Sequence, residues 1–155
     1  MSDYKLPFDS LIEDRALQRY WITRIVAYLI DLFLVSFFLI IVYSLADAVL
    51  LRFVLPPDPF APLLAFEGLG FGLTMVIYAT LAEAYYGKTL GKKLMYMHTQ
   101  SGKGTKPSIQ ASIVRNISKI HWLLLLLDIL AGLIARGDAH ERYLDRIAST
   151  RVALA

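Results

Sequence analysis

Residues 22–46 form an almost wholly apolar run, whose charged members are Arg24 and Asp31. A helix needs roughly 20 residues to cross the hydrocarbon core of a bilayer, so this run is long enough to span one. Tyr20 and Trp21 stand at its start, where aromatic rings favour the headgroup level. The run exceeds the roughly 7–15 apolar residues of a cleaved signal peptide and follows a polar leader, which favours a retained membrane helix.

The composition also indicates a membrane protein. Apolar residues make up 57% of the 155-residue chain and charged residues 19%, whereas a soluble domain is about 25% charged. The apolar residues are gathered into three segments, and a proline-rich loop separates the first two. We expect a polar N-terminal segment over residues 1–20 and a membrane domain over 21–155, with membrane helices at about 22–46, 63–83 and 109–135.

The third apolar segment is expected to be broken. At 100° per residue, a continuous helix would turn Arg115 away from Asp128 by about 140°. The segment 84–119 and the C-terminal tail are rich in basic residues, whereas the proline-rich loop holds only Arg52. Basic segments stay in the cytoplasm, which places the N-terminus, the 84–119 segment and the tail on that side of a cell membrane. The third segment is therefore predicted to be broken or re-entrant, with a simple three-crossing topology left open.

Two short segments are expected to form strands. Residues 94–100, followed by a turn at 101–104, indicate a short hairpin, and residues 147–154 indicate another strand. Pairing between the two segments would build a cap on the cytoplasmic side. The predicted fold class is an all-α membrane protein, with a helical hairpin, a broken or re-entrant third segment and a small cytoplasmic β-hairpin or strand cap.

Arg24, Tyr28 and Asp31 are candidate functional residues because they share one helical face. Arg24 and Asp31 are seven residues apart, which leaves them within about 20° of each other around the helix axis. An ionised carboxylate in the middle of a bilayer costs roughly 2.5–3.5 kcal/mol on insertion scales, so Asp31 must face protein or water. Two interpretations stay open: a transport site, or an ion pair or hydrogen-bonded latch that holds helices together.

Asp128 is the second candidate carboxylate at membrane depth. His121 precedes it by seven residues, on the same face of a helix. A carboxylate and a histidine in a site of low dielectric could relay protons. In the alternative interpretation, His121 and Trp122 anchor the chain at the membrane surface.

Gly68 and Gly72 form a small-residue pair in the second apolar segment. Glycines four residues apart let two helix backbones approach closely. The pair is therefore a candidate packing face, including the contact that a homo-oligomer would need. In the alternative interpretation, these glycines only loosen the end of the helix.

Other kinds of chemistry find little support. The chain has no cysteine, so a thiolate nucleophile and a cysteine metal site are excluded. The glycines and lysines of residues 87–93 lack the spacing of a phosphate-binding loop, and the cluster Asp138, His140 and Glu141 lacks a second histidine for a metal. A net charge of +3 suits loops beside anionic lipid, whereas nucleic-acid binding would require a dense basic stripe. We expect no enzyme activity, cofactor, metal or nucleic-acid partner.

Several short motifs, in order, make residues 19–154 resemble the RDD family of small membrane proteins. The family is named for an arginine at the start of its first helix, an aspartate in mid-helix and a second aspartate near the C-terminus. Arg24 and Asp31 fit the first two, and residues 87–94 look like the family's Gly-Lys segment. Arg115 resembles its later arginine, and on the match of residues 142–152 to its closing motif, Asp145 is the second named aspartate.

Two functions of different classes stay open. Members of the family have been proposed to move solutes, and some are linked to cation/proton exchange. The first expectation is therefore a small transporter, such as an antiporter of Na⁺, K⁺ or Li⁺ against protons, working as a homo-oligomer in the lipid bilayer. The second is a scaffold or regulator that binds another membrane protein and moves no solute. In that case Asp145 would pair with Arg115 or a loop lysine and lock the cytoplasmic layer.

Overall fold

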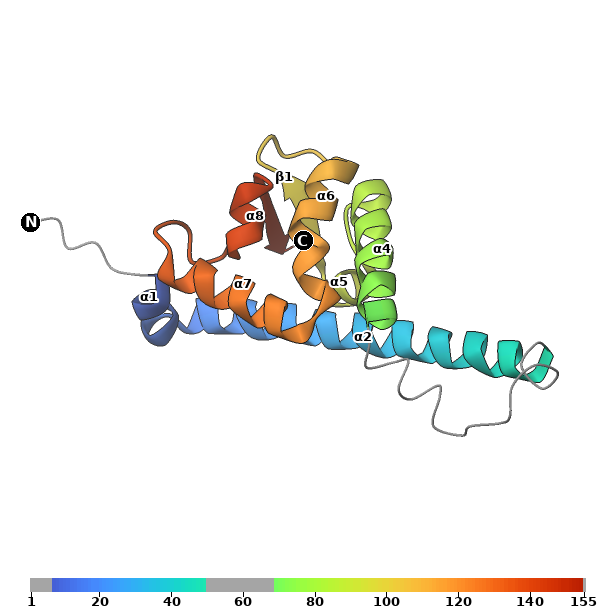
Figure 1. Cartoon of the computed structure of the whole chain (residues 1–155). Helices are drawn as coiled ribbons and strands as arrows, with labels where there is room; N and C mark the ends of the chain where they lie inside the picture. The colour runs from blue at the N-terminus through green and yellow to red at the C-terminus, as the bar shows by residue number, and fades with distance from the viewer. Residues whose placement is uncertain (1–6, 50–68, 155) are drawn as a thin grey trace, which may run out of the picture.

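The computed structural model describes residues 7–49 and 69–154 of the chain (Figure 1). Helices dominate these residues, together with a two-stranded sheet. The elements in chain order are α1 (Pro7–Glu13), α2 (Arg15–Val49), α4 (Leu69–Tyr86), α5 (Leu90–Leu94), β1 (Met97–Ser101), α6 (Ile109–Asn116), the 3₁₀ helix η2 (Ile117–Ile120), α7 (Trp122–Ile134), α8 (Tyr143–Ile147) and β2 (Thr150–Leu154).

The first predicted membrane helix is present as α2, which is longer than expected at both ends. No glycine or proline interrupts its sequence, and the Asp14 carboxylate accepts a hydrogen bond of 2.7 Å from the Ala16 amide at its start. Among the described residues, α2 is the one helix that alone is long and apolar enough to cross a membrane. Between Phe37 and Leu45 most of its large apolar side chains are exposed, and the second half of α2 extends past the other described elements (Figure 1).

The predicted break in the third apolar segment is confirmed. The helical stretches Ile109–Ile120 and Trp122–Ile134 meet at an angle of 116°. His121 lies between them with an extended backbone (φ −147°, ψ 137°) and caps α7 by accepting a hydrogen bond from the Leu123 amide. Only together are the two stretches long and apolar enough to form a membrane span.

The second predicted helix is present from Leu69 as α4, while residues 63–68, with Gly68, lie outside the described part of the chain. The helix packs chiefly against α6 and η2 and crosses α2 steeply, so α2 and α4 do not pack along each other as a hairpin (Figure 1). Gly72 explains the close contact with η2, because a Cβ there would lie 1.8 Å from the carbonyl oxygen of Ile120. Within the described residues, Gly72 thus serves packing inside one copy of the chain.

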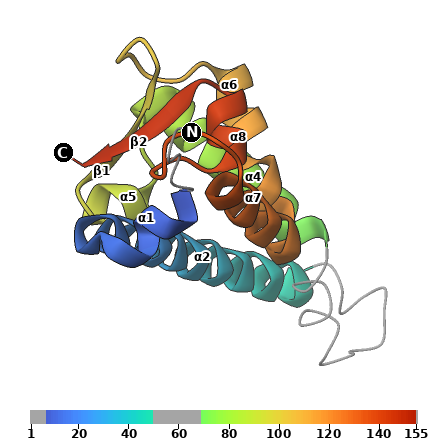
Figure 2. The same ribbon diagram turned by 90° about the vertical axis from the view of Figure 1, so that its left-hand side faces the viewer.

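The predicted strand cap is also confirmed, but the prediction of a local hairpin was wrong. Strands β1 and β2 pair antiparallel, with Thr99 opposite Val152, although about fifty residues separate them in the chain (Figure 2). The expected turn is present, since the Gly104 amide donates to the Ser101 carbonyl, but it leads into α6 instead of a neighbouring strand. The partner of β1 is therefore the C-terminal strand.

The apolar core lies where the first turns of α2 meet the sheet and α7. It consists of Leu17, Tyr20, Trp21, Met97, Leu133 and Val152. Two of these residues, Leu17 and Tyr20, come from the segment 1–20 that was expected to be polar. The Tyr20 hydroxyl also donates to the Val152 carbonyl at 3.0 Å, and so ties the start of α2 to β2.

Candidate functional site

Nine charged side chains are buried together between the helices, and we call them the buried charge cluster. Every element of the fold from α2 to α8 except β1 supplies at least one of them. The cluster consists of the carboxylates Asp31, Glu83, Asp128 and Asp145 and the cations Arg24, Lys92, Arg115, Lys119 and Arg142.

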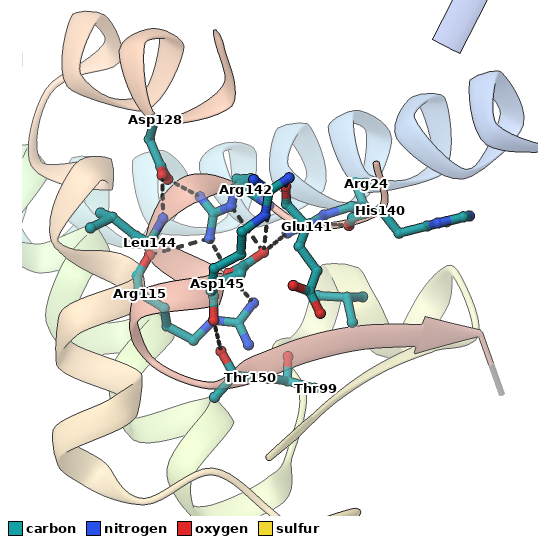
Figure 3. A network of polar contacts seen from close by, with 12 residues as sticks. Arg24, Thr99, Arg115, Asp128, His140, Glu141, Arg142, Leu144, Asp145 and Thr150 are labelled. Carbon is teal, nitrogen blue, oxygen red and sulfur yellow. Dashed lines mark hydrogen bonds and ion pairs between the residues drawn. The ribbon is translucent and has the colours of Figure 1, made fainter. Parts of the chain in front are cut away.

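Asp145 is the centre of one half of the cluster (Figure 3). Its carboxylate contacts the guanidinium groups of Arg24 at 2.6 Å, Arg115 at 3.1 Å and Arg142 at 3.2 Å. The three arginines belong to α2, α6 and the residue before α8, so one fully buried carboxylate joins three parts of the chain. Burial opposes its charge, but the three arginines outweigh that effect and hold the pKa of Asp145 well below its ordinary value.

The local sequence explains why Asp145 can turn inward. It is the third residue of α8, and its carboxylate also accepts from the backbone amide of Arg142 at 3.4 Å. Helix α8 is held in place by Arg146, whose guanidinium donates to the carbonyls of Gly132 and Ala135 at the end of α7. The end of α7 therefore gains the hydrogen bonds it would otherwise lack, and α8 gains a fixed position.

Glu83 is the centre of the other half. Its carboxylate contacts Arg115 Nε at 3.2 Å, accepts from Asn116 Nδ2 at 2.9 Å and pairs with Lys92, which also donates to Thr99 at 2.8 Å. Arg115 thereby connects the two halves. Burial lowers the pKa of Lys92 to about 7, against the attraction of Glu83, so this lysine is protonated below neutral pH.

Asp128 joins α7 to the same layer. It contacts Arg142 Nη1 at 3.3 Å and accepts a hydrogen bond from the Leu144 amide at 2.8 Å (Figure 3). It also accepts a hydrogen bond from the Ser118 hydroxyl at 3.0 Å. Because Ser118 precedes the bend and Asp128 follows it, the hydrogen bond also fixes the angle between η2 and α7.

Asp31 differs from the other three carboxylates, because all its described hydrogen-bond donors are neutral. They are the Thr89 hydroxyl at 2.6 Å, the Gly91 amide at 2.8 Å and the Tyr78 hydroxyl at 2.9 Å. Gly91 permits this approach, because a Cβ there would lie 2.0 Å from the Ala27 carbonyl oxygen. The first turn of α5 is therefore pressed against α2 at Asp31.

A cavity of about 70 Å³ lies beside Asp31, between α2, α5, η2 and α7. Its lining includes apolar side chains, among them Trp21, Ile25 and Ile129. Its charged and hydroxyl-bearing lining consists of Arg24, Tyr28, Asp31, Lys92, Lys119 and Arg142. The cavity thus has one carboxylate and four cationic side chains in its wall.

The structure brings most of the candidate residues together, though not always in the expected pairs. Arg24, Tyr28 and Asp31 line the same cavity, but Arg24 forms its ion pair with Asp145. The expected pairing of Asp145 with Arg115 is present. His121 lies apart from Asp128: it is exposed and caps α7. Gly68 lies outside the described residues.

Sequence reasoning left out several residues of the site. The sequence does not single out Glu83, Lys92 or Arg142 as site residues: Glu83 ends the second apolar segment, and Lys92 and Arg142 lie in basic segments and family motifs. Their signal was a charged residue at the border of an apolar segment, which equally suits a solvated helix end. The hydroxyls of Tyr78 and Thr89 gave no sequence signal, since only the fold brings them to Asp31.

Within residues 7–49 and 69–154, no group of His, Asp and Glu side chains has the arrangement of a metal site. A comparison with protein families finds that residues 19–149 match the model of the RDD family. Comparisons with curated proteins and with solved structures find no match to this chain.

Proposed function

The chain belongs to the RDD family, and on this premise we propose that it is a multi-pass membrane protein that moves a small solute through the cavity beside Asp31, as an oligomer. One observation carries the proposal. Asp31 is buried, lines a cavity and is bound by neutral groups, whereas ion pairs occupy the other three carboxylates of the cluster. An ionisable residue at membrane depth that faces a cavity is typical of a solute path.

The strand pairing supports a membrane arrangement in which β1 and β2, which flank the bent helices, lie on one side of the membrane. Because β1 and β2 are hydrogen-bonded, the segments before α6 and after α7 lie on the same side of any bilayer that the chain enters. The bent pair of α6 with η2 and α7 then enters and returns, since irregular backbone is tolerated at membrane depth where protein surrounds it. Because basic residues favour the cytoplasmic side of the cell membrane, we place the strands and the start of α2 on that side.

An oligomer is part of the proposal because one copy offers few helices to enclose a path. The second half of α2 supports it, because this half extends past the other described elements (Figure 1). Phe37, Phe38 and Ile41 are exposed there. Lipid or the same helix of another copy would cover these side chains.

The family resemblance implies exchange of Na⁺, K⁺ or Li⁺ for protons. That version requires the metal ion to enter a cavity with four cationic side chains in its wall, where repulsion opposes it. The positive charge of the lining therefore disfavours a metal cation as the solute and leaves transport of another small solute as the proposal.

A scaffold or regulator is the second candidate function. The observation that favours it is the number of ion pairs that lock the elements together: Asp145 alone connects α2, α6 and α8. In this function the cluster is a latch that holds a rigid surface for another membrane protein. Such a protein would co-purify with a stoichiometric partner.

Flux into liposomes distinguishes the two functions. Wild type, Asp31→Asn and the control Asp138→Asn, which changes an exposed carboxylate, would be reconstituted after a check that each is folded and monodisperse. Internal pH and anion content would be followed after addition of Na⁺, K⁺ or Li⁺ and, separately, of a chloride gradient. A transporter gives flux that is lost in Asp31→Asn and kept in Asp138→Asn. Absence of flux under both kinds of gradient, from folded wild type, would overturn transport and leave the scaffold.

A further inference from the structure

The buried charge cluster holds more positive than negative groups. Within the described residues it contains five cationic side chains and four carboxylates. Ion pairs account for four of the cations: Arg24 with Asp145, Lys92 with Glu83, Arg115 with both carboxylates, and Arg142 with Asp128 and Asp145. These four cations share three carboxylates, so the cluster as a whole carries one positive charge in excess, and Lys119 and Asp31 are its members without an ion pair among the described residues.

The fifth cation is Lys119. This side chain is 8% exposed, and within the described part of the chain its ammonium has neither a hydrogen bond nor an ion pair. Its electrostatic neighbours are Glu83, Arg142, Asp31 and Arg115, which face it from α4, from the start of α8, from α2 and from α6. A buried ammonium without a hydrogen-bond partner is costly, and a bound anion would offset that cost.

Lys119 lines the cavity beside Asp31. Arg24, Lys92 and Arg142 line it too, so a negative ion there would be close to four cationic groups and one carboxylate. Ile25, which also lines the cavity, is 51% exposed, so the lining reaches the surface of the described structure.

The size of the cavity restricts the ligand. Pockets for drug-sized molecules measure roughly 300–1,000 Å³, whereas this one measures about 70 Å³. That volume suffices for a small ion with one or two waters, because a single water needs roughly 10–15 Å³ by the same kind of measure.

We propose that the cavity beside Asp31 binds a small inorganic anion with one negative charge, with Lys119 as its principal partner. A single negative charge matches the surplus, whereas an alkali cation would add to it. This inference rests on the proposed function, because it names the class of solute that the same cavity would transport. Binding itself can be measured without any flux.

The test uses the full chain in a nonionic detergent at pH 6, where Lys92 is protonated. Of the two tryptophans, Trp21 lines the cavity and Trp122 is exposed, so a Trp122→Phe background leaves Trp21 as the reporter. Chloride would replace gluconate at constant ionic strength. We expect a saturable change in Trp21 emission, with affinity lowered roughly tenfold or more in Lys119→Met. The control Lys103→Met changes an exposed turn lysine and should keep the wild-type affinity.

A thermal measurement gives a second readout that needs no fluorescent reporter. The unfolding midpoint of wild type should rise with chloride concentration, because a ligand that binds only the folded state stabilises it. Lys119→Met should unfold at a higher temperature than wild type in gluconate and show no such rise, because its unpaired charge is gone. A wild-type midpoint independent of chloride, or an equal response in Lys119→Met, would overturn the anion site.

Failure of this inference can be told from failure of transport. Saturable binding without flux supports the anion site and removes the transporter. Flux without saturable anion binding keeps the transporter and overturns the anion site.

Discussion

At the scale of single residues, the unusual feature is a carboxylate shared by three arginines. Asp145 is fully buried, and its contacts with Arg24, Arg115 and Arg142 measure 2.6–3.2 Å. A buried ion pair is weak evidence for stability, because desolvation offsets the attraction. Removal of one member is a different matter, since it leaves the other charges buried without compensation.

Replacement of Asp145 by asparagine should therefore destabilise the protein strongly. The change removes the one charge that three guanidinium groups share, and the expected loss is about 3–5 kcal/mol at pH 7. The free energy of unfolding in detergent measures it. Asp138→Asn, at an exposed carboxylate, serves as the control and should have a much smaller effect. Equal losses in the two variants would show that the Asp145 contacts contribute nothing specific.

The same carboxylate predicts how stability depends on acid. The pKa of folded Asp145 lies well below the ordinary 3.8 of the unfolded chain. Its contribution to stability is thus fully present above that ordinary value and is lost as the pH falls toward the folded pKa. Unfolding midpoints from pH 7 to pH 3 should fall more steeply in wild type than in Asp145→Asn. Parallel curves would contradict this assignment.

At the scale of elements, α5 is a five-residue helix that cannot be stable alone. It is held by Thr89 and Gly91, which donate to Asp31, and by the close contact of Gly91 with the Ala27 carbonyl. Lys92, its third residue, reaches Glu83 on α4. One short helix therefore connects α2 with α4 and forms part of the cavity wall.

A methyl group at position 91 should separate α5 from α2. In Gly91→Ala the new Cβ would lie 2.0 Å from the Ala27 carbonyl oxygen, so one of the two helices must move. We expect a loss of about 1–3 kcal/mol in unfolding free energy and faster hydrogen exchange in α5. Gly70→Ala in α4 is the matched control, because nothing lies within 4 Å of its Cβ. A loss in Gly70→Ala as large as in Gly91→Ala would refute the close contact.

At the scale of the whole molecule, the pairing of β1 with β2 decides how the chain is arranged. It places residues 97–101 beside residues 150–154, and the core beneath joins both to the start of α2. The helices between the strands therefore leave the sheet and return to it, with the 116° bend at the far point (Figures 1 and 2).

Disulfide crosslinking tests this arrangement, since the chain has no cysteine of its own. His98 and Ala153 are paired across the strands, so His98→Cys with Ala153→Cys should form a disulfide on mild oxidation. The pair Lys103→Cys with Ala153→Cys, which places one thiol in the exposed turn, should form far less. In intact cells both thiols should be shielded from a reagent that cannot cross the membrane. Labelling of position 153 alone from outside would contradict the same-side arrangement.

The sequence by itself determined the local elements. An apolar run of this length without glycine or proline predicted the long helix α2. The positions of Arg115 and Asp128, which would point away from each other on a continuous helix, predicted a break near His121. Local patterns also predicted the two strands, and the family motifs predicted that Asp145 pairs with Arg115 or a loop lysine, of which the structure has Arg115. These features follow from short-range chain geometry or from family motifs.

Only the tertiary structure decided which charges meet. Arg24 and Asp31 share a face of α2, yet Arg24 pairs with Asp145 and Asp31 binds the first turn of α5. Helix geometry sets the direction in which a side chain points, but its partner comes from whichever element packs there. The steep crossing of α4 over α2, the unpaired Lys119 and the cavity beside Asp31 arise in the same way, because they depend on packing between segments far apart in the chain.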